Sequence, residues 1–246
     1  MAGMITGMAA AGEPGTVAKV WKDGDGGELL YRWHEPEKKE QGAVFPLVLF
    51  LHGAGERGDD NRAQIKHGVA DILKWTAEND QPCFLLAPQC PKEVWWAELD
   101  RETMNLMPGG KPEKPLLRVL KLVEEVMEKQ SVDPGRVYVT GLSMGGYGTW
   151  SMLATVPEKI AAAMPVCGGG DPESVAKFAK VPVWVFHGAK DGAVPLASSE
   201  RMVEALKKAG GEPKFRVYPE AGHDSWSATY RDGKVLEWMF GQVRGE

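Results

Sequence analysis

The stretch VYVTGLSMGGYGTW, residues 137–150, decides the fold class of this 246-residue chain. A β-branched, apolar run leads into Gly141-Leu-Ser-Met-Gly145, and a segment with helical character follows. This G-x-S-x-G pattern between a strand and a helix is typical of a sharp turn that lifts a serine hydroxyl above a sheet. Because so tight a turn leaves no room for side chains beside the serine, Gly141 and Gly145 indicate that Ser143 is a nucleophile.

The rest of the chain alternates between strand and helix patterns. Residues 16–21 and 28–33 predict an antiparallel hairpin around an Asp/Gly-rich turn, and the apolar run 45–51 is typical of a strand buried on both faces. We expect further strands at 83–87, 137–140, 161–166, 181–186 and 215–218, and helices at 65–75, 116–127, 144–156, 202–209 and 234–240. This order predicts an α/β fold with a mostly parallel sheet and helices on both faces. We expect an N-terminal tail at 1–15 and one domain at 16–246.

Composition excludes several function classes. The net charge is −5 and no basic stripe is visible, which argues against nucleic-acid binding. The longest apolar run, residues 44–51, is too short to cross a bilayer. The N-terminus lacks the basic region of an intact signal peptide, so a cytoplasmic chain and a domain of an exported protein both fit. The three cysteines show no metal-ligand spacing; we expect free, partly buried thiols and neither metal nor cofactor.

A serine nucleophile needs a base at the same edge of the sheet, where the parallel strands end. His223 follows the last expected strand and is the predicted base. Packing, surface or backbone-structuring roles are expected for the other histidines: His34, His52, His67 and His187. The base needs an acid, and Asp191 follows the preceding strand, with Asp171 as the rival. Asp224 is too near His223 in sequence to orient it.

Acyl transfer also requires amide donors for the developing oxyanion. Leu51-His-Gly-Ala-Gly55 follows the early buried strand, where esterases place one such donor. We expect the backbone N–H groups of Ala54, with Gly55 as the alternative, and of Met144 to serve. The charged run at 56–61 is expected to pair across loops and to have no catalytic role.

Four motifs together resemble a known family: LHGAGERGDDN, VYVTGLSMGGYGTW, VFHGAKDGAVP and PEAGHDSW. The chain from about residue 16 onward is similar to serine esterases of the α/β-hydrolase superfamily. Within it, the motifs resemble the predicted peptidase and phospholipase/carboxylesterase group related to dienelactone hydrolases and to feruloyl and acetyl xylan esterases. The resemblance implies the chain order Ser143, Asp191, His223. Dienelactone hydrolases proper use a cysteine nucleophile, whereas the turn at residues 141–145 of this chain carries Ser143.

The sequence indicates less about the substrate than about the catalytic residues. Only residues 167–173 separate the strand at 161–166 from a further helical segment that we expect directly after Glu173, so we expect no large cap and an open cleft. Trp95, Trp96 and Trp226 are candidates to hold an aryl acyl group or a sugar ring, with simple loop packing as the alternative. We expect a serine carboxylesterase acting on short-chain, aryl or carbohydrate-linked esters. A serine peptidase of the same fold and a catalytically silent carbohydrate-binding module are the alternatives.

Overall fold

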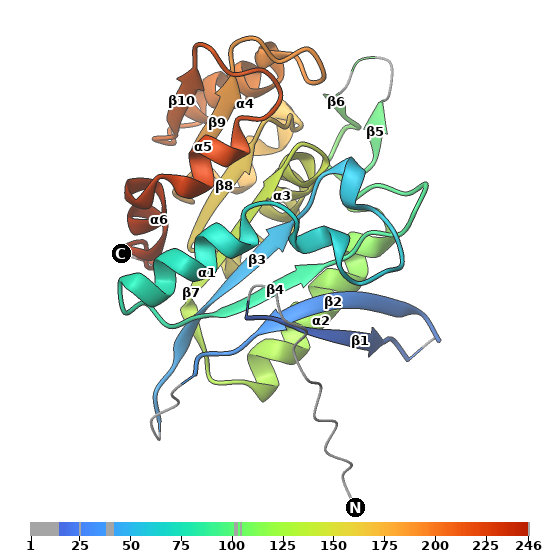
Figure 1. Cartoon of the computed structure of the whole chain (residues 1–246). Coiled ribbons are helices and arrows are strands. Elements are labelled where there is room, and N and C mark those ends of the chain that lie inside the picture. The colour runs from blue at the N-terminus through green and yellow to red at the C-terminus, as the bar shows by residue number, and fades with distance from the viewer. Residues whose placement is uncertain (1–14, 25, 38–41, 101–102, 104, 246) are drawn as a thin grey trace, which may run out of the picture.

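An eight-stranded mixed sheet forms the centre of the computed structural model, which describes residues 15–24, 26–37, 42–100, 103 and 105–245 (Figure 1). Its strand order is β1-β2-β4-β3-β7-β8-β9-β10. β1 and β2 form an antiparallel hairpin, β2 pairs antiparallel with β4, and every later neighbour pair is parallel. The strands are β1 (Val17–Lys22), β2 (Glu28–His34), β3 (Phe45–Leu51), β4 (Phe84–Pro88), β7 (Val132–Leu142), β8 (Ala162–Val166), β9 (Trp184–Gly188) and β10 (Lys214–Tyr218).

Helices cover both faces of this sheet, as the sequence predicted. α1, α5 and α6 lie in front of it in Figure 1, and α2, α3 and α4 lie behind it. The helices are α1 (Val69–Glu78), α2 (Lys114–Lys129), α3 (Met144–Thr155), α4 (Leu196–Lys208), α5 (Trp226–Arg231) and α6 (Gly233–Phe240). Short 3-10 helices span Ala54–Glu56, Ala63–Ile65, Pro157–Lys159 and Pro172–Lys177, and β5 (Leu99–Asp100) pairs with β6 (Asn105–Leu106) outside the main sheet.

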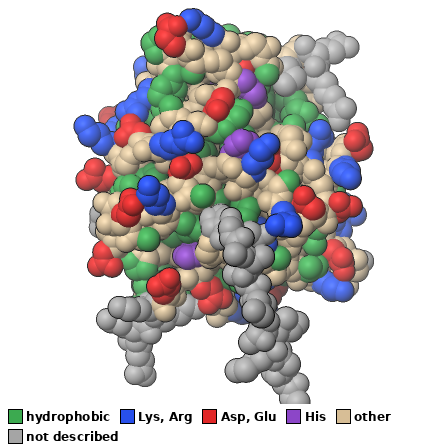
Figure 2. Space-filling model, viewed as in Figure 1, with side chains coloured by type: hydrophobic (Ala, Val, Ile, Leu, Met, Phe, Trp, Pro, Cys, Tyr) green, Lys and Arg blue, Asp and Glu red, His purple; other side chains and the backbone are tan. Residues whose placement is uncertain are grey.

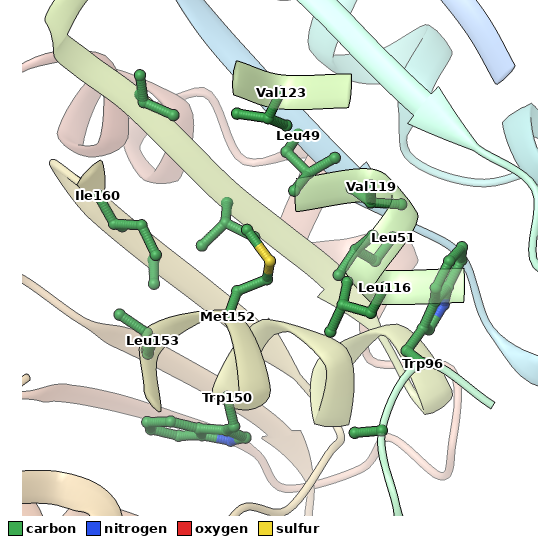
Figure 3. Packing of buried hydrophobic residues seen from close by; sticks show 14 of the residues in the cluster. Leu49, Leu51, Trp96, Leu116, Val119, Val123, Trp150, Met152, Leu153 and Ile160 are labelled. Carbon is green, nitrogen blue, oxygen red and sulfur yellow. The ribbon is translucent and has the colours of Figure 1, made fainter. Parts of the chain in front are cut away.

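The two faces of β3 explain why its sequence is apolar throughout. All seven of its residues are buried. Leu47, Leu49 and Leu51 belong to the core under α2 and α3, whereas Val48 and Phe50 belong to the core under α1, α5 and α6. Figure 3 shows Leu49 and Leu51 against side chains from α2 and α3. Because successive strand residues point to opposite faces, a strand with helices on both sides must be apolar at every position.

Some element boundaries differ from the sequence prediction. The helix expected at 65–75 begins only at Val69, because Gly68 has a φ of +73° that breaks the helical path after the 3-10 turn Ala63–Ile65. β7 begins at Val132, five residues before the expected strand. α5 was not expected at all. Of the predicted tail at 1–15, all but Gly15 lies outside the described residues.

The sheet brings the carboxyl ends of β3, β7, β8, β9 and β10 to one edge. After β8 the chain reaches the 3-10 helix Pro172–Lys177 in five residues, so no cap is inserted there. Cations and anions are interspersed over the face shown in Figure 2, in keeping with the small net charge. Among the described residues, no helix is long and apolar enough to cross a membrane.

Candidate active site

Ser143 lies on the turn that joins β7 to α3, in a conformation that only a tightly held residue adopts. Its φ is +52° and its ψ is −116°, outside the regions that residues with a side chain favour. A Cβ on Gly145 would overlap the Leu51 carbonyl group, and a Cβ on Gly141 would lie 2.6 Å from the same oxygen. The turn therefore presses against β3. The Ser143 amide donates to the Val166 carbonyl at 2.9 Å, which ties the turn to β8 as well.

His223 and Asp191 lie beside this serine. The loop after β10 carries His223, whose Nε2 lies 2.9 Å from Ser143 Oγ. Its Nδ1 lies 2.8 Å from Asp191 Oδ2, on the loop after β9. A carboxylate only accepts hydrogen bonds, so Nδ1 carries the proton and Nε2 is free to accept from the serine hydroxyl. His223 thus links Ser143 to Asp191, and the three side chains come from separate motifs of the sequence.

The surroundings of Asp191 keep its carboxylate charged. Burial of this side chain acts to raise its pKa, but hydrogen bonds from His223, Val194 and Ala193 outweigh burial and hold the pKa below its ordinary value. The two amides donate to Oδ1 at 2.8 and 2.9 Å, which fixes the carboxylate and directs Oδ2 toward His223. The fixed carboxylate therefore accepts from the His223 ring in one defined orientation.

His187 is a buried histidine next to the same carboxylate. Its Nε2 lies 3.2 Å from Asp191 Oδ2 and 3.0 Å from the Val194 carbonyl, and its Nδ1 lies 2.7 Å from Ser199 Oγ. Burial lowers the pKa of His187, although the bond to the Val194 carbonyl and the Asp191 carboxylate act to raise it. A neutral His187 therefore supports the loop that carries Asp191, in line with the structural role expected for it.

The rival acids lie elsewhere. The Asp171 side chain accepts from the Glu173 amide and from the Gly109 amide, and so begins the 3-10 helix Pro172–Lys177. The Asp224 carboxylate accepts from Ser227 through both backbone and hydroxyl. Both carboxylates bond to backbone amides elsewhere, and Asp191 is the carboxylate that contacts His223.

The loop after β3 is shaped by His52. Its Nδ1 donates to the Gly53 carbonyl at 2.6 Å, and its Nε2 accepts from the Cys90 amide at 2.9 Å. Burial lowers the pKa of His52 to about 4, although the bond to Gly53 acts to raise it, so the ring is neutral near pH 7. The expected structuring role of His52 thus has a physical basis.

The two expected oxyanion donors occupy neighbouring turns. Ala54 begins the 3-10 helix Ala54–Glu56 and Met144 begins α3, so both amides belong to first helical turns, where N–H groups lack intrahelical acceptors. A Cβ on Gly53 would lie 2.8 Å from a side-chain carbon of Leu142, so the two turns are in contact. The role of Ala54 and Met144 as an oxyanion hole stays a prediction.

The charged run at 56–61 pairs across loops, as expected. Gln89, at the end of β4, binds three of its residues: its Nε2 donates to Asp60 Oδ1 and to the Glu56 carbonyl, and its Oε1 accepts from the Asn61 amide. Arg57 donates to the Ala54 carbonyl at 2.9 Å. These bonds stabilise the loop next to the predicted oxyanion donor.

The three candidate tryptophans differ in position. Trp96 is fully buried and donates to the His52 carbonyl at 3.0 Å, and Figure 3 shows it beside Leu116 in the core. The prediction that Trp96 lines the cleft is therefore wrong: it packs the core under the loop. Trp95 is half-buried, with the Arg57 guanidinium 5.8 Å from its ring centre. Trp226 is half-buried and lies edge-on to the His223 ring, with centroids 5.3 Å apart.

Sequence reasoning missed two residues beside this group. His67 lies 5.5 Å from Trp226, centroid to centroid, and its Nε2 is 3.6 Å from Glu56 Oε1. Glu56 is buried within the loop after β3. For Glu56, the only signal in the sequence was its position in that loop. For His67 there was no signal, because it lies in the turn before α1.

Comparisons with known proteins agree with this fold. The model of the dienelactone hydrolase family matches residues 97–235, more than half of the chain. A protein of Oryza sativa subsp. japonica named "Probable carboxylesterase" is 27% identical over 197 residues, 72% of this chain and 80% of that protein. An uncharacterized secreted protein of Arthroderma benhamiae is 26% identical over 235 residues, 80% of this chain and 24% of that protein.

Solved structures extend the likeness. A thermostable esterase is 40% identical, with a TM-score of 0.87 over 94% of this chain and 64% of that chain. A ferulic acid esterase at 18% identity shares the fold, with a TM-score of 0.68 over 92% of this chain and 98% of that chain. Together with the sheet order, these matches confirm the predicted α/β-hydrolase fold. The chain spans less than two thirds of the thermostable esterase and of the Arthroderma protein.

Proposed function

The chain belongs to the dienelactone hydrolase family, and we propose that it is a cofactor-free serine carboxylesterase whose catalytic domain spans residues 16–246. One observation carries this proposal: His223 Nε2 lies 2.9 Å from Ser143 Oγ, while Nδ1 of the same ring is held by Asp191. A hydroxyl becomes a useful nucleophile only when a base accepts its proton. The similarity to carboxylesterases agrees with this chemistry.

The reaction begins at Ser143. Its Oγ attacks the ester carbonyl as His223 Nε2 takes the hydroxyl proton. The amides of Ala54 and Met144 donate to the negative oxygen of the tetrahedral intermediate. His223 then gives its proton to the departing alcohol, which leaves an acyl group on Ser143. A water molecule, deprotonated by the same nitrogen, releases the acid and restores the serine.

Asp191 acts through His223. Its fixed carboxylate keeps the proton on Nδ1 before attack and stabilises the imidazolium that forms afterwards. The depressed pKa of Asp191 keeps this carboxylate charged near neutral pH. The carboxylate does not take the proton itself.

Two features support the proposed substrate class. No cap is inserted after β8, and Trp226 lies edge-on to the catalytic imidazole. An aromatic wall beside the reacting carbonyl favours short-chain, aryl or carbohydrate-linked esters. An ester panel from acetyl through long-chain acyl to feruloyl measures this preference; fastest turnover of long-chain esters would contradict it.

The decisive test is Ser143→Ala assayed with a small chromogenic acyl ester. We expect kcat to fall at least about a thousandfold, because the nucleophile is lost. Ser227→Ala is the matched control, since this exposed hydroxyl contacts Asp224 and should leave turnover intact. Thermal unfolding of both variants shows whether they fold. Retained hydrolysis by folded Ser143→Ala would refute the assignment, and faster cleavage of a peptide amide than of the matching ester would favour a peptidase.

A further inference from the structure

Cys167 lies directly beneath the proposed catalytic group. It follows β8, and β8 lies between β7, which leads to Ser143, and β9, which leads to Asp191. Its backbone has a φ of +40°, and its amide donates to the Phe186 carbonyl at 2.8 Å. The thiol is therefore fixed at the centre of the catalytic edge, although the proposed reaction makes no use of it.

The thiol completes a set of metal-binding donors. Cys167, Asp191 and His223 each offer one ligand atom, and these three atoms all lie within 4.8 Å of one another. Sulfur, imidazole nitrogen and carboxylate oxygen are the donors that Zn²⁺ prefers in proteins. The sequence alone did not indicate this set, because the three residues follow three different strands and are far apart along the chain.

A buried hydroxyl points to the same place. Ser225 is fully buried, and its Oγ has no hydrogen-bond partner among the residues that the structure describes. Burial raises the pKa of the Cys167 thiol to about 12, while the Ser143 backbone and the Ser225 hydroxyl act to lower it. The Ser225 oxygen thus lies beside the Cys167 sulfur, and no other residue that the structure describes bonds to it.

We propose that Cys167, Asp191 and His223 form an inhibitory site for a thiophilic divalent cation, Zn²⁺ in the first place, with Ser225 or a water molecule as the fourth donor. Metal–ligand bonds of about 2.0–2.3 Å place tetrahedral ligand atoms about 3.2–3.7 Å apart. The three ligand atoms are now at most 4.8 Å apart, so the wider pairs must approach by up to about 1.6 Å, a distance that side-chain rotation and small loop shifts supply.

Binding would stop catalysis through the tautomer of His223. The cation bonds to Nδ1, which faces Asp191, so the Nδ1 proton is displaced and a neutral ring must carry its proton at Nε2. That nitrogen then donates toward Ser143 instead of accepting from it. The thiol proton leaves for solvent, because a coordinated cysteine binds as thiolate. The inhibitory consequence rests on the proposed function, but the binding does not.

The first experiment measures inhibition. ZnCl₂ in a non-chelating buffer is titrated into wild type, Cys167→Ser and Cys83→Ser. The rate of each protein on the chromogenic ester is divided by its own rate without metal. Cys83 is the matched control, because it is equally buried but precedes β4, at the opposite edge of the sheet. We expect Cys167→Ser to need at least about tenfold more Zn²⁺ for half-inhibition, Cys83→Ser to match wild type, and EDTA to restore the rate.

The second experiment measures binding without turnover. Cd²⁺ is added to wild type, Ser143→Ala and the double variant Ser143→Ala/Cys167→Ser, and the ultraviolet absorption of the cadmium–thiolate bond is recorded. We expect the band in the first two proteins and its loss in the third. Equal zinc inhibition of wild type and Cys167→Ser, or a band that does not depend on Cys167, would overturn the proposal. Because Ser143→Ala has no nucleophile, this arm remains decisive even if the proposed esterase activity is absent.

Discussion

Gly145 lies against the Leu51 carbonyl group, with no space for a side chain. An alanine at this position would gain helix propensity, but its Cβ would overlap backbone atoms that cannot rotate away. We expect Gly145→Ala to cost about 3 kcal/mol and to lower the melting temperature by about 6–12 °C. Esterase turnover should fall as well, since Leu51 leads into the loop that carries Ala54.

Gly24→Ala is the control for this variant. A Cβ on Gly24 would meet no atom within 4 Å, so we expect a change within about 0.5 kcal/mol. Thermal unfolding and assays of both proteins make the comparison. A Gly145→Ala protein as stable and active as wild type would show that the turn after β7 accommodates a side chain. It would contradict the tight packing that we give as the reason for the strained backbone of Ser143.

Trp95 and Trp96 are adjacent in sequence but occupy different environments, so the same substitution should affect them differently. Trp96→Phe leaves a cavity and leaves the His52 carbonyl without its indole donor, at an expected cost of about 1–3 kcal/mol. Trp95→Phe, at a half-buried site, should cost less than about 0.5 kcal/mol. Denaturant unfolding measures both. Equal costs would contradict the burial difference.

The sequence identified candidate site residues where a motif constrains the backbone. It did not identify residues that reach the site only through tertiary packing. Ser143 was identifiable from the glycines around it, and Asp191 and His223 from their positions after strands. No motif constrains Trp96. Its neighbour Trp95 is the same residue type on the same loop, so the sequence does not show which of the two rings points into the core. Glu56, His67 and Cys167 were missed as neighbours of the site because their proximity arises from tertiary packing.

At the scale of elements, α5 is the helix that sequence patterns did not predict. It has six residues, too few for a clear apolar period, and packing holds it in place. Tyr230 on α5 bonds to Thr140 Oγ1 on β7 at 2.9 Å, and Thr140 Oγ1 donates to the Met164 carbonyl. The Tyr230 hydroxyl is therefore the donor to Thr140, and it ties the helix after the His223 loop to the sheet.

Tyr230→Phe tests this connection. Loss of one buried hydrogen bond should cost about 1 kcal/mol and lower the melting temperature by about 2–4 °C, with the ring packing retained. Tyr218→Phe is the control, because Tyr218 is only partly buried and its hydroxyl contacts Thr229 at 3.1 Å, a bond that water can replace. If the two variants lost the same stability, α5 would not depend on the buried bond.

β3 and β8 were predicted more closely than the start of α1, for a physical reason. β3 and β8 are bounded by abrupt changes from apolar to polar or glycine-rich sequence, and their predicted bounds agree with the structure within one residue. The start of α1 depends on Gly68, whose positive φ ends a 3-10 turn instead of continuing a helix. Apolar periodicity runs through both segments and does not distinguish them.

At the scale of the whole molecule, two loops of the catalytic edge depend on buried neutral histidines. His52 is 1% exposed and His187 is fully buried, and burial lowers the pKa of each. Each ring bonds a backbone carbonyl and so fixes the loop after β3 or the loop after β9. These two loops carry Ala54 and Asp191, so protonation of either histidine acts on the same edge of the sheet.

We therefore expect stability to decline in mild acid before most carboxylates titrate. The unfolded chain takes up a proton at His52 near its ordinary pKa of 6.5, whereas the folded protein does so only near pH 4. The stability held by the neutral ring is thus complete above pH 6.5 and is lost as the pH falls through 4, by about 3 kcal/mol for His52. Denaturant unfolding between pH 7.5 and 4 measures this slope. His52→Gln should be less stable at pH 7.5, because an amide replaces the ring imperfectly, but its stability should fall less steeply with pH. Parallel slopes for wild type and His52→Gln would show that the buried ring at the end of β3 does not control the acid response.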